Sequence, residues 1–112
     1  FCHNDLIKNN IINEGNRFVI IDFEYAQTND VFFDLAAIAS SYQFYEQQQS
    51  QLVNLYCQQG NLTINRELAK NKLDIFCFIY NALCYFWYIK RGFDEAAILA
   101  LSQLNQSEFK SK

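Results

Sequence analysis

Proline is absent from this sequence, and glycine occurs only three times in its 112 residues. Both residues interrupt regular secondary structure, so their scarcity predicts long elements in which each glycine marks a real boundary. Methionine is absent as well. No natural start of translation is therefore visible, and we expect the chain to be a piece of a longer protein.

Basic charge is also scarce, because 9 lysines and arginines stand against 12 acidic residues, for a net charge of −3. Proteins that bind nucleic acids need a basic surface for the phosphate backbone, so this balance argues against that class. The longest apolar stretch, residues 75–89, contains Asn81 and is shorter than the ~20 residues that cross a bilayer. It predicts a buried helix and no membrane span. Because no signal peptide is visible, we expect a cytoplasmic protein.

The 4 cysteines include no C-x-x-C pair, the spacing typical of metal and redox sites. Cys77 and Cys84 lie on one expected helix, where their spacing separates them by roughly 10 Å along the axis, too far for a disulfide. We therefore expect free thiols in a reducing compartment.

Hydrophobic residues make up 51% of the chain and aromatic residues 17%, enough for the core of one domain. Two apolar, β-branched runs at 9–13 and 17–22 flank a turn sequence at 13–16. The glycine in that turn can supply a positive φ angle, so the pattern predicts a β-hairpin. Such a hairpin would return Asp22 to the neighbourhood of Asn10.

Helical patterns occupy most of the remaining chain. From Phe32 onward apolar residues recur at helical spacing, with Asp34 either as the N-cap or as an early negative charge. Three more helices are predicted, at 46–59, 65–91 and 94–104. Gly60 and Gly92 are placed to end the first two of these.

The helix at 65–91 becomes apolar on all sides between residues 76 and 88, which predicts burial in the middle of a helical body. The last residues are polar, and we expect them to be frayed. A hairpin followed by several helices is typical of the α+β class. The sequence therefore predicts a small hairpin packed on a mostly helical body.

The start of the chain carries polar residues at a distinctive spacing. His3, Asp5 and Asn10 form H-x-D-x-x-x-x-N, and Asp22 ends the next apolar run. Phosphoryl transfer needs a carboxylate beside the attacking hydroxyl, and oxygen ligands that hold Mg²⁺ on the phosphates. Asp5 fits the catalytic base, and Asn10 and Asp22 fit the metal ligands. The alternative is that these side chains only satisfy backbone groups of a loop.

His3 has two interpretations. It is either catalytic, or a buried imidazole that hydrogen-bonds the loop backbone and fixes its shape. The second is favoured because a lone histidine makes a poor metal site.

Three segments carry a resemblance to a known family: 1–10, 21–25 and 29–36, the last with the pattern D-x-x-x-D-L-A. They resemble the choline/ethanolamine kinase group, within the aminoglycoside phosphotransferase-like and protein-kinase-like superfamily. The resemblance implies that residues 1–112 are the C-terminal, catalytic lobe of a kinase-like phosphotransferase whose N-terminal nucleotide-binding lobe is absent. It also implies ATP as co-substrate, Mg²⁺ as cofactor and a role in phospholipid biosynthesis.

The resemblance extends to the substrate. It implies that Glu24 and Tyr25 line the substrate end of the cleft. A quaternary ammonium such as that of choline is best held by aromatic faces near a carboxylate. The aromatic cluster at 85–88 offers Trp87 first and Tyr85 next as further contacts, or is simply core. Family members often have a second tryptophan in this helix, which is missing here.

Asp30 and Asp34 of the third segment are expected to support the site. They would tie the loop to the catalytic segment through backbone hydrogen bonds, and a solvated helix cap is the alternative.

The leading hypothesis is an enzyme that transfers the γ-phosphate of ATP to the hydroxyl of a small amino alcohol, above all choline. Ethanolamine, thiamine or an aminoglycoside is the alternative acceptor, although a polycation would want more acidic residues than Glu24 and Glu46. A non-catalytic kinase-like binding domain is the third hypothesis, and the intact Asp5, Asn10 and Asp22 set argues against it. No glycine-rich phosphate loop or Walker lysine is present, so we expect these 112 residues alone to be inactive.

Overall fold

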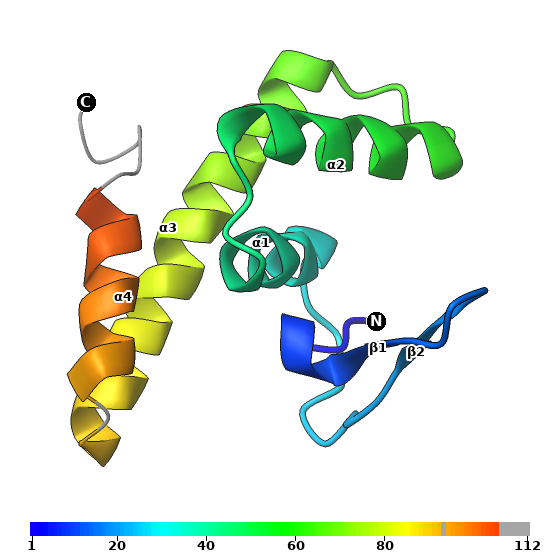
Figure 1. The fold of residues 1–112 in the computed structure, drawn as a ribbon. Helices are drawn as coiled ribbons and strands as arrows, with labels where there is room; N and C mark the ends of the chain where they lie inside the picture. The colour runs from blue at the N-terminus through cyan, green and yellow to red at the C-terminus, as the bar shows by residue number, and fades with distance from the viewer. Residues whose placement is uncertain (93, 106–112) are drawn as a thin grey trace.

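The computed structural model describes residues 1–92 and 94–105, which form several helices and one small sheet (Figure 1). In chain order the elements are a 3₁₀ turn η1 (Lys8–Asn10), strands β1 (Ile11–Asn13) and β2 (Phe18–Ile20), and helices α1 (Val31–Ser41), α2 (Glu46–Gln59), α3 (Arg66–Arg91) and α4 (Asp94–Asn105). The predicted α+β class is confirmed. Within the described ranges, no helix is both long and apolar enough to cross a membrane.

The predicted hairpin is present as the antiparallel pair β1–β2, with Ile12 opposite Val19. Gly15 in its turn adopts φ +91°, a left-handed angle that glycine takes without a steric clash. Both strands are shorter than the apolar runs, and β1 begins late because the chain forms η1 first.

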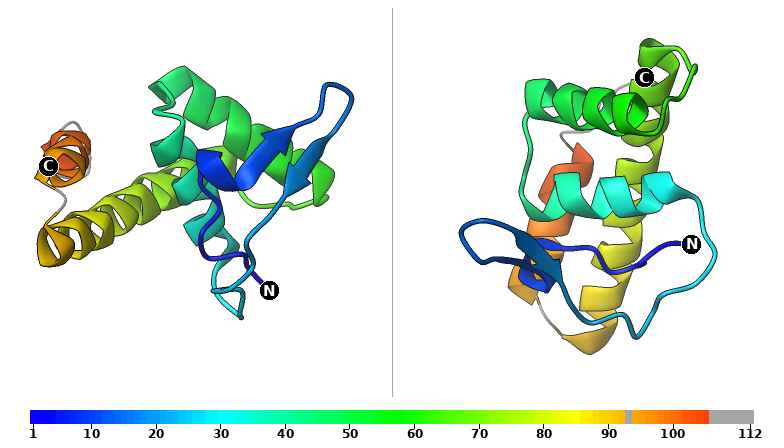
Figure 2. Two further views of the ribbon diagram at one scale, coloured as in Figure 1. Left: turned by 60° about the horizontal axis from the view of Figure 1, so that its bottom comes forward. Right: turned by 90° about the vertical axis from the view of Figure 1, so that its right-hand side faces the viewer.

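The hydrophobic core lies where α1 packs against α2 and α3, and α1 lies between α2 and the hairpin (Figure 2). It is built from Phe32, Leu35 and Ala36 of α1, Val53 and Cys57 of α2, and Ala69 and Leu73 of α3. The alanines are fully buried, and such small side chains let helix backbones approach closely. α4 runs antiparallel along the C-terminal half of α3 and buries Ala97 and Ala100 (Figure 1).

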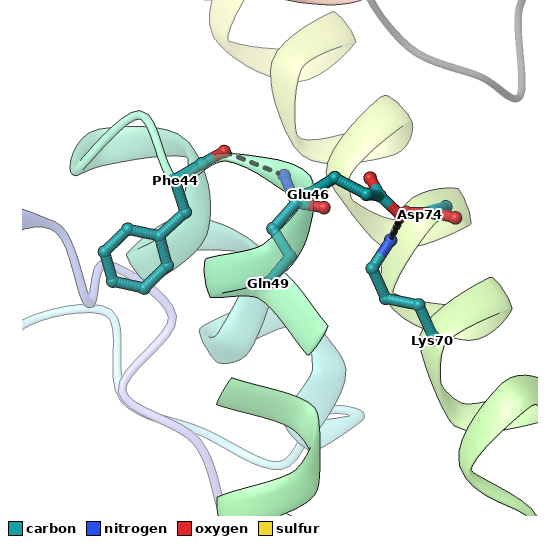
Figure 3. A network of polar contacts seen from close by, with 5 residues as sticks. All are labelled: Phe44, Glu46, Gln49, Lys70 and Asp74. Atoms are coloured by element: carbon teal, nitrogen blue, oxygen red, sulfur yellow. Dashed lines mark hydrogen bonds and ion pairs between the residues drawn. The ribbon is translucent and has the colours of Figure 1, made fainter. Parts of the chain in front are cut away.

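A polar network adds to this packing between α2 and α3 (Figure 3). Lys70 Nζ lies 2.6 Å from both Glu46 Oε1 and Asp74 Oδ1. Burial lowers the pKa of Lys70, but the hydrogen bonds to Asp74 and Glu46 outweigh it and leave the pKa raised. Gln49 Nε2 donates to Phe44 O (3.2 Å), which ties the start of α2 to the turn before it.

The ends of the helices refine the sequence predictions. Asp30 is the N-cap of α1 and accepts a hydrogen bond from the backbone of its first turn (3.0 Å), so Asp34 is the early negative charge instead. Gly92 follows α3 with φ +75°, as a C-terminal glycine should. Gly60 ends α2 without a left-handed angle, which the next residue, Asn61, takes at φ +53°.

The prediction that the apolar part of α3 is buried on all sides is wrong. Ile79, Leu83 and Phe86 are 40%, 54% and 67% exposed. Within the described residues, α1, α2 and α4 cover other faces of α3 and leave this one open. An all-round apolar pattern therefore does not say which neighbours are present to cover the helix.

All four cysteines are free, as predicted, and Cys2 and Cys57 are buried. The fraying expected for the polar end of the chain concerns residues 106–112, which lie outside the described residues.

Candidate active site

Asp34 holds the start of residues 3–7, the loop that carries Asp5 and is called the Asp5 loop below. Its buried carboxylate accepts hydrogen bonds from His3 N–H at Oδ2 and from Asn4 N–H at Oδ1, both at 2.9 Å. These are charge-assisted bonds, and the place of Asp34 in the first turn of α1 favours its negative charge. The helix thus anchors the Asp5 loop by a side chain that lies far from it in sequence.

His3 joins the same loop to the end of the hairpin. The ring is buried, with Nε2 2.8 Å from Ile21 O and Nδ1 3.1 Å from the backbone nitrogen of Asp5. Because a carbonyl oxygen only accepts, Nε2 carries the hydrogen and Nδ1 accepts, which is the neutral imidazole. Both ring nitrogens are bound to backbone groups, so this imidazole orients the loop and has no nitrogen left for proton transfer.

Asn10 is buried beside Asp5 at the end of η1. Its Nδ2 donates to Asp5 O (2.8 Å) and to Asp5 Oδ2 (3.2 Å). The Ile21 N–H donates to Asn10 O (3.0 Å), so the hairpin brings Asp22 next to Asn10, as its turn sequence predicts. Since Nδ2 is used by Asp5, the side-chain oxygen is the atom of Asn10 left for a cation.

The pKa of Asp5 is raised above its ordinary value, mainly by burial of the carboxyl group. The hydrogen bond from Asn10 opposes the rise, and the negative charge of Asp22 adds to it. Asp22 therefore lies close enough for its charge to act on Asp5. A carboxylate with a raised pKa has a higher affinity for the proton of an attacking hydroxyl.

Asp22 is exposed and adopts a left-handed backbone angle, φ +64°. Residues other than glycine rarely take such angles, and when they do they gather at functional sites. The oxygens of Asn10 and Asp22 are hard donors that fit Mg²⁺, an ion that also keeps water and phosphate ligands. Among residues 1–92 and 94–105, no group of three or more His, Cys, Asp or Glu could hold a metal ion.

Glu24 and Tyr25 lie on the exposed segment after Asp22. Together with Asn4, Asn29 and others they line a hollow of about 400 Å³. The side chain of Tyr25 is 58% exposed, and its carbonyl accepts a hydrogen bond from Asn4 Nδ2 (2.9 Å). The hollow therefore adjoins the Asp5 loop, and an acidic and an aromatic residue are among those that line it.

A second hollow, of about 220 Å³, lies between the Asp5 loop and α3. Tyr80, Cys84 and Tyr88 line it from the helix, and Ile7 lines it from the loop. Burial raises the pKa of Tyr80, and the negative charge of Asp5 makes a smaller contribution in the same direction. These helix residues are not among the site residues predicted above, although their four-residue spacing marks one face of a helix and is visible in the sequence.

Trp87 and Tyr85 line neither of these two hollows. The Trp87 side chain is 45% exposed, and Arg91 Cζ lies 4.1 Å from its ring centroid. Tyr85 packs edge-on against Phe86, with their ring centroids 5.6 Å apart. Of the predicted substrate contacts, the structure brings Glu24 and Tyr25 to the Asp5 loop and leaves these two aromatic residues apart from them.

Asp30 supports the helical body instead of the Asp5 loop. Besides capping α1, its Oδ2 lies 2.8 Å from Lys72 Nζ of α3. Burial raises the pKa of Asp30, but the hydrogen bonds from Lys72 and from Phe32 N–H outweigh it, so the pKa lies below its ordinary value. Asp30 is therefore a helix cap, which was the alternative considered from the sequence. The hydrogen bonds to the loop backbone that were expected of both aspartates are made by Asp34.

The sequence model of the family described as choline/ethanolamine kinase matches residues 1–81, from the Asp5 loop into α3. The protein LicA of Haemophilus influenzae strain Rd is 34% identical over 88 residues, which cover 77% of this chain and 33% of LicA. Another LicA of Haemophilus influenzae is also 34% identical over 88 residues, which cover 26% of its length. The chain thus spans at most about a third of these curated relatives. No solved structure matched it.

Proposed function

This chain belongs to the choline/ethanolamine kinase family, and from that premise we propose that it carries the catalytic residues of an ATP- and Mg²⁺-dependent phosphotransferase. The reaction moves the γ-phosphate of ATP to the hydroxyl of a small amino alcohol, with choline as the proposed acceptor. The observation that carries this proposal is the hydrogen bond from Asn10 to Asp5, together with the backbone bond from Ile21 to Asn10 that brings the neighbouring Asp22 to the same end of the hairpin.

Asp5 is the proposed catalytic base. Its Oδ2 accepts a hydrogen bond from Asn10 Nδ2 (3.2 Å), which orients the carboxylate and leaves Oδ1 to receive the acceptor hydroxyl. Burial raises the pKa of Asp5 and so strengthens its hold on the hydroxyl proton as the bond to phosphorus forms.

Asn10, through Oδ1, and Asp22, through its carboxylate, are the proposed Mg²⁺ ligands. Held by these two residues, Mg²⁺ would supply positive charge to offset the negative charge that develops on the transferred phosphate. A neutral amide among carboxylates adds a ligand without adding repulsion. His3 and Asp34 support this arrangement by fixing the backbone of residues 3–5 and joining it to Ile21 at the end of the hairpin.

Glu24 and Tyr25 are the proposed contacts for the ammonium end of the acceptor. A quaternary ammonium cannot donate an N–H bond, so an aromatic face with a carboxylate nearby suits it. The hollow that these residues line, about 400 Å³, has room for a small amino alcohol. Trp87 is a weaker candidate because the guanidinium of Arg91 already lies 4.1 Å from its ring centroid, and Tyr85 is weaker because it packs against Phe86.

The test measures ADP release by the full-length protein with choline, ethanolamine, thiamine and an aminoglycoside as separate acceptors. We expect Mg²⁺-dependent release with choline preferred, and we expect Asp22→Ala to abolish it. Asp94→Asn is the matched control, because Asp94 is an exposed aspartate at the start of α4. A preference for another acceptor corrects the substrate, whereas calorimetry that finds no binding of Mg²⁺-ATP overturns the catalytic proposal.

A further inference from the structure

Asn4, between His3 and Asp5, has a side chain whose amide is fully engaged with the segment after Asp22. Its Nδ2 donates to Tyr25 O (2.9 Å) and to Gln27 O (3.4 Å). Its Oδ1 accepts from Asn29 Nδ2 (2.9 Å). A single side chain thus joins the Asp5 loop to three points along residues 25–29.

Asn29 also forms a hydrogen bond with the N-cap residue of the first helix, α1. Its Oδ1 accepts from Asp30 N–H (2.8 Å), and Asp30 is the N-cap of α1. Beside it, Cys2 and Gln27 exchange two backbone hydrogen bonds (2.9 and 3.1 Å). The segment at 23–30 is therefore fastened at its far end, while Glu24 and Tyr25 stand near its start.

The backbone of Asn4 is constrained as well. It adopts a left-handed angle, φ +68°, which asparagine tolerates better than most residues. Its N–H is bound to Asp34 Oδ1 (2.9 Å), so the buried carboxylate holds the backbone of Asn4 to α1. Geometry of this kind is maintained only where the surrounding structure requires it.

We propose that the Asn4–Asn29 amide pair is a positioning device that sets where Glu24 and Tyr25 stand relative to Asp5. This inference rests on the proposed function, because it assigns the pair an effect on the acceptor end of that site. Neither residue contacts the reacting atoms. The pair holds the carboxylate of Glu24 and the ring of Tyr25 at a fixed place beside Asp5. These are the groups proposed to bind the acceptor.

The kinetic experiment compares Asn4→Gly and Asn29→Ala in the full-length protein. Glycine keeps the left-handed backbone of Asn4 and removes only the amide. Because a misplacement of about 1 Å costs up to 100-fold, we expect kcat/KM for choline to fall about 10- to 100-fold in each variant. The KM for ATP should stay within about 2-fold, since neither proposed Mg²⁺ ligand, Asn10 or Asp22, belongs to residues 23–30. The loss in the double variant should be smaller than the product of the two single losses, because both variants remove the shared Asn4–Asn29 hydrogen bond.

Asn61→Gly is the matched control, because Asn61 is also an asparagine with a left-handed angle, φ +53°, in the turn after α2. We expect its kinetics to equal those of the wild type. If Asn4→Gly keeps a wild-type kcat/KM for choline and only lowers the midpoint of thermal unfolding, the pair is merely structural and the inference is wrong.

Hydrogen exchange of the full-length protein without substrate separates this inference from the proposed function. We expect backbone amides in residues 23–30 to exchange faster in Asn4→Gly and at the wild-type rate in Asn61→Gly. Unchanged exchange in Asn4→Gly would overturn the inference. If the wild type phosphorylates no amino alcohol, the proposed function fails, and faster exchange still supports the amide pair as the fastening of this segment.

Discussion

The first thirty residues and the helices after them are stabilised by different forces. In the helical body, Leu73, Val53 and Cys57 are almost completely buried in an apolar core. In the hairpin region, apolar side chains such as Phe18 and Phe23 are 69% and 55% exposed, and the backbone is held by side-chain hydrogen bonds instead. The helices therefore supply the stability, and the polar contacts supply the placement of the site.

This comparison predicts that changes in the two regions have separable effects. A substitution in the polar region should change catalysis more than folding, because few apolar atoms are buried there. A substitution in the core should change folding more than catalysis. Of the substitutions that follow, the one at the proposed base should have the largest effect.

Asp5→Asn removes the group that takes the hydroxyl proton. We expect kcat in the full-length protein to fall about 100- to 10,000-fold, the range typical for the loss of a general base. The midpoint of thermal unfolding should not fall, because the substitution removes a carboxylate whose burial already raises its pKa. Coupled ADP release and calorimetric melting measure the two quantities. Near-wild-type turnover would contradict the role of Asp5.

Leu73→Ala tests the other region. Leu73 is fully buried at the junction of α1, α2 and α3, so we expect the free energy of unfolding to fall by about 2–5 kcal/mol. The KM values of the enzyme that remains folded should be unchanged. Leu83→Ala on the same helix is the control. Leu83 is 54% exposed, so its substitution should lower the free energy of unfolding much less. Denaturant unfolding compares them, and equal losses would contradict the placement of the core.

Asp34→Ala should affect both properties, because Asp34 belongs to α1 and binds the Asp5 loop. It leaves the backbone N–H groups of His3 and Asn4 without their acceptor, which we expect to cost about 1–3 kcal/mol of stability. Turnover should also fall, since the loop loses its anchor. Asp34→Asn keeps one oxygen acceptor and should recover part of both losses. If Asp34→Ala lowers stability but keeps full turnover, Asp34 does not support the site.

Lys72→Met should have the smallest effect. The Asp30–Lys72 pair is partly exposed, with side chains 37% and 41% accessible, so it is worth about 0–1 kcal/mol after solvent screening. The pKa of Asp30 is lowered in the folded state, so its contribution is present above the ordinary aspartate pKa of 3.8 and is lost as pH falls through the lower, folded value.

The difference in stability between the wild type and Lys72→Met should therefore shrink as the pH falls through that window. Unfolding measured from neutral to acid pH checks this. In an Asp30→Asn background, where the cap is kept and the charge is gone, Lys72→Met should show no such dependence on pH. A dependence that persists there would assign it to another group.

Local features of this protein follow from the sequence alone. The turn residues and apolar runs predict the hairpin, and periodicity and glycine placement predict the bounds of α2 and the end of α3 at Gly92. The spacing from His3 to Asn10 is also read directly from the sequence. The return of the predicted hairpin then brings Asp22 next to Asn10. These features depend on residues that are close in sequence, so propensity and spacing carry the information.

Only the tertiary structure decided the rest. It put Asp30 instead of Asp34 at the cap of α1, left one apolar face of α3 open, and turned Tyr80 and Tyr88 toward the Asp5 loop. It also joined Asn4 to Asn29, 25 residues away in sequence. A periodic pattern shows that a helix has an apolar face but not what packs there. Likewise, the sequence does not identify the hydrogen-bond partner of a polar residue when that partner is so far along the chain. Contacts of that kind exist only once the helices have packed.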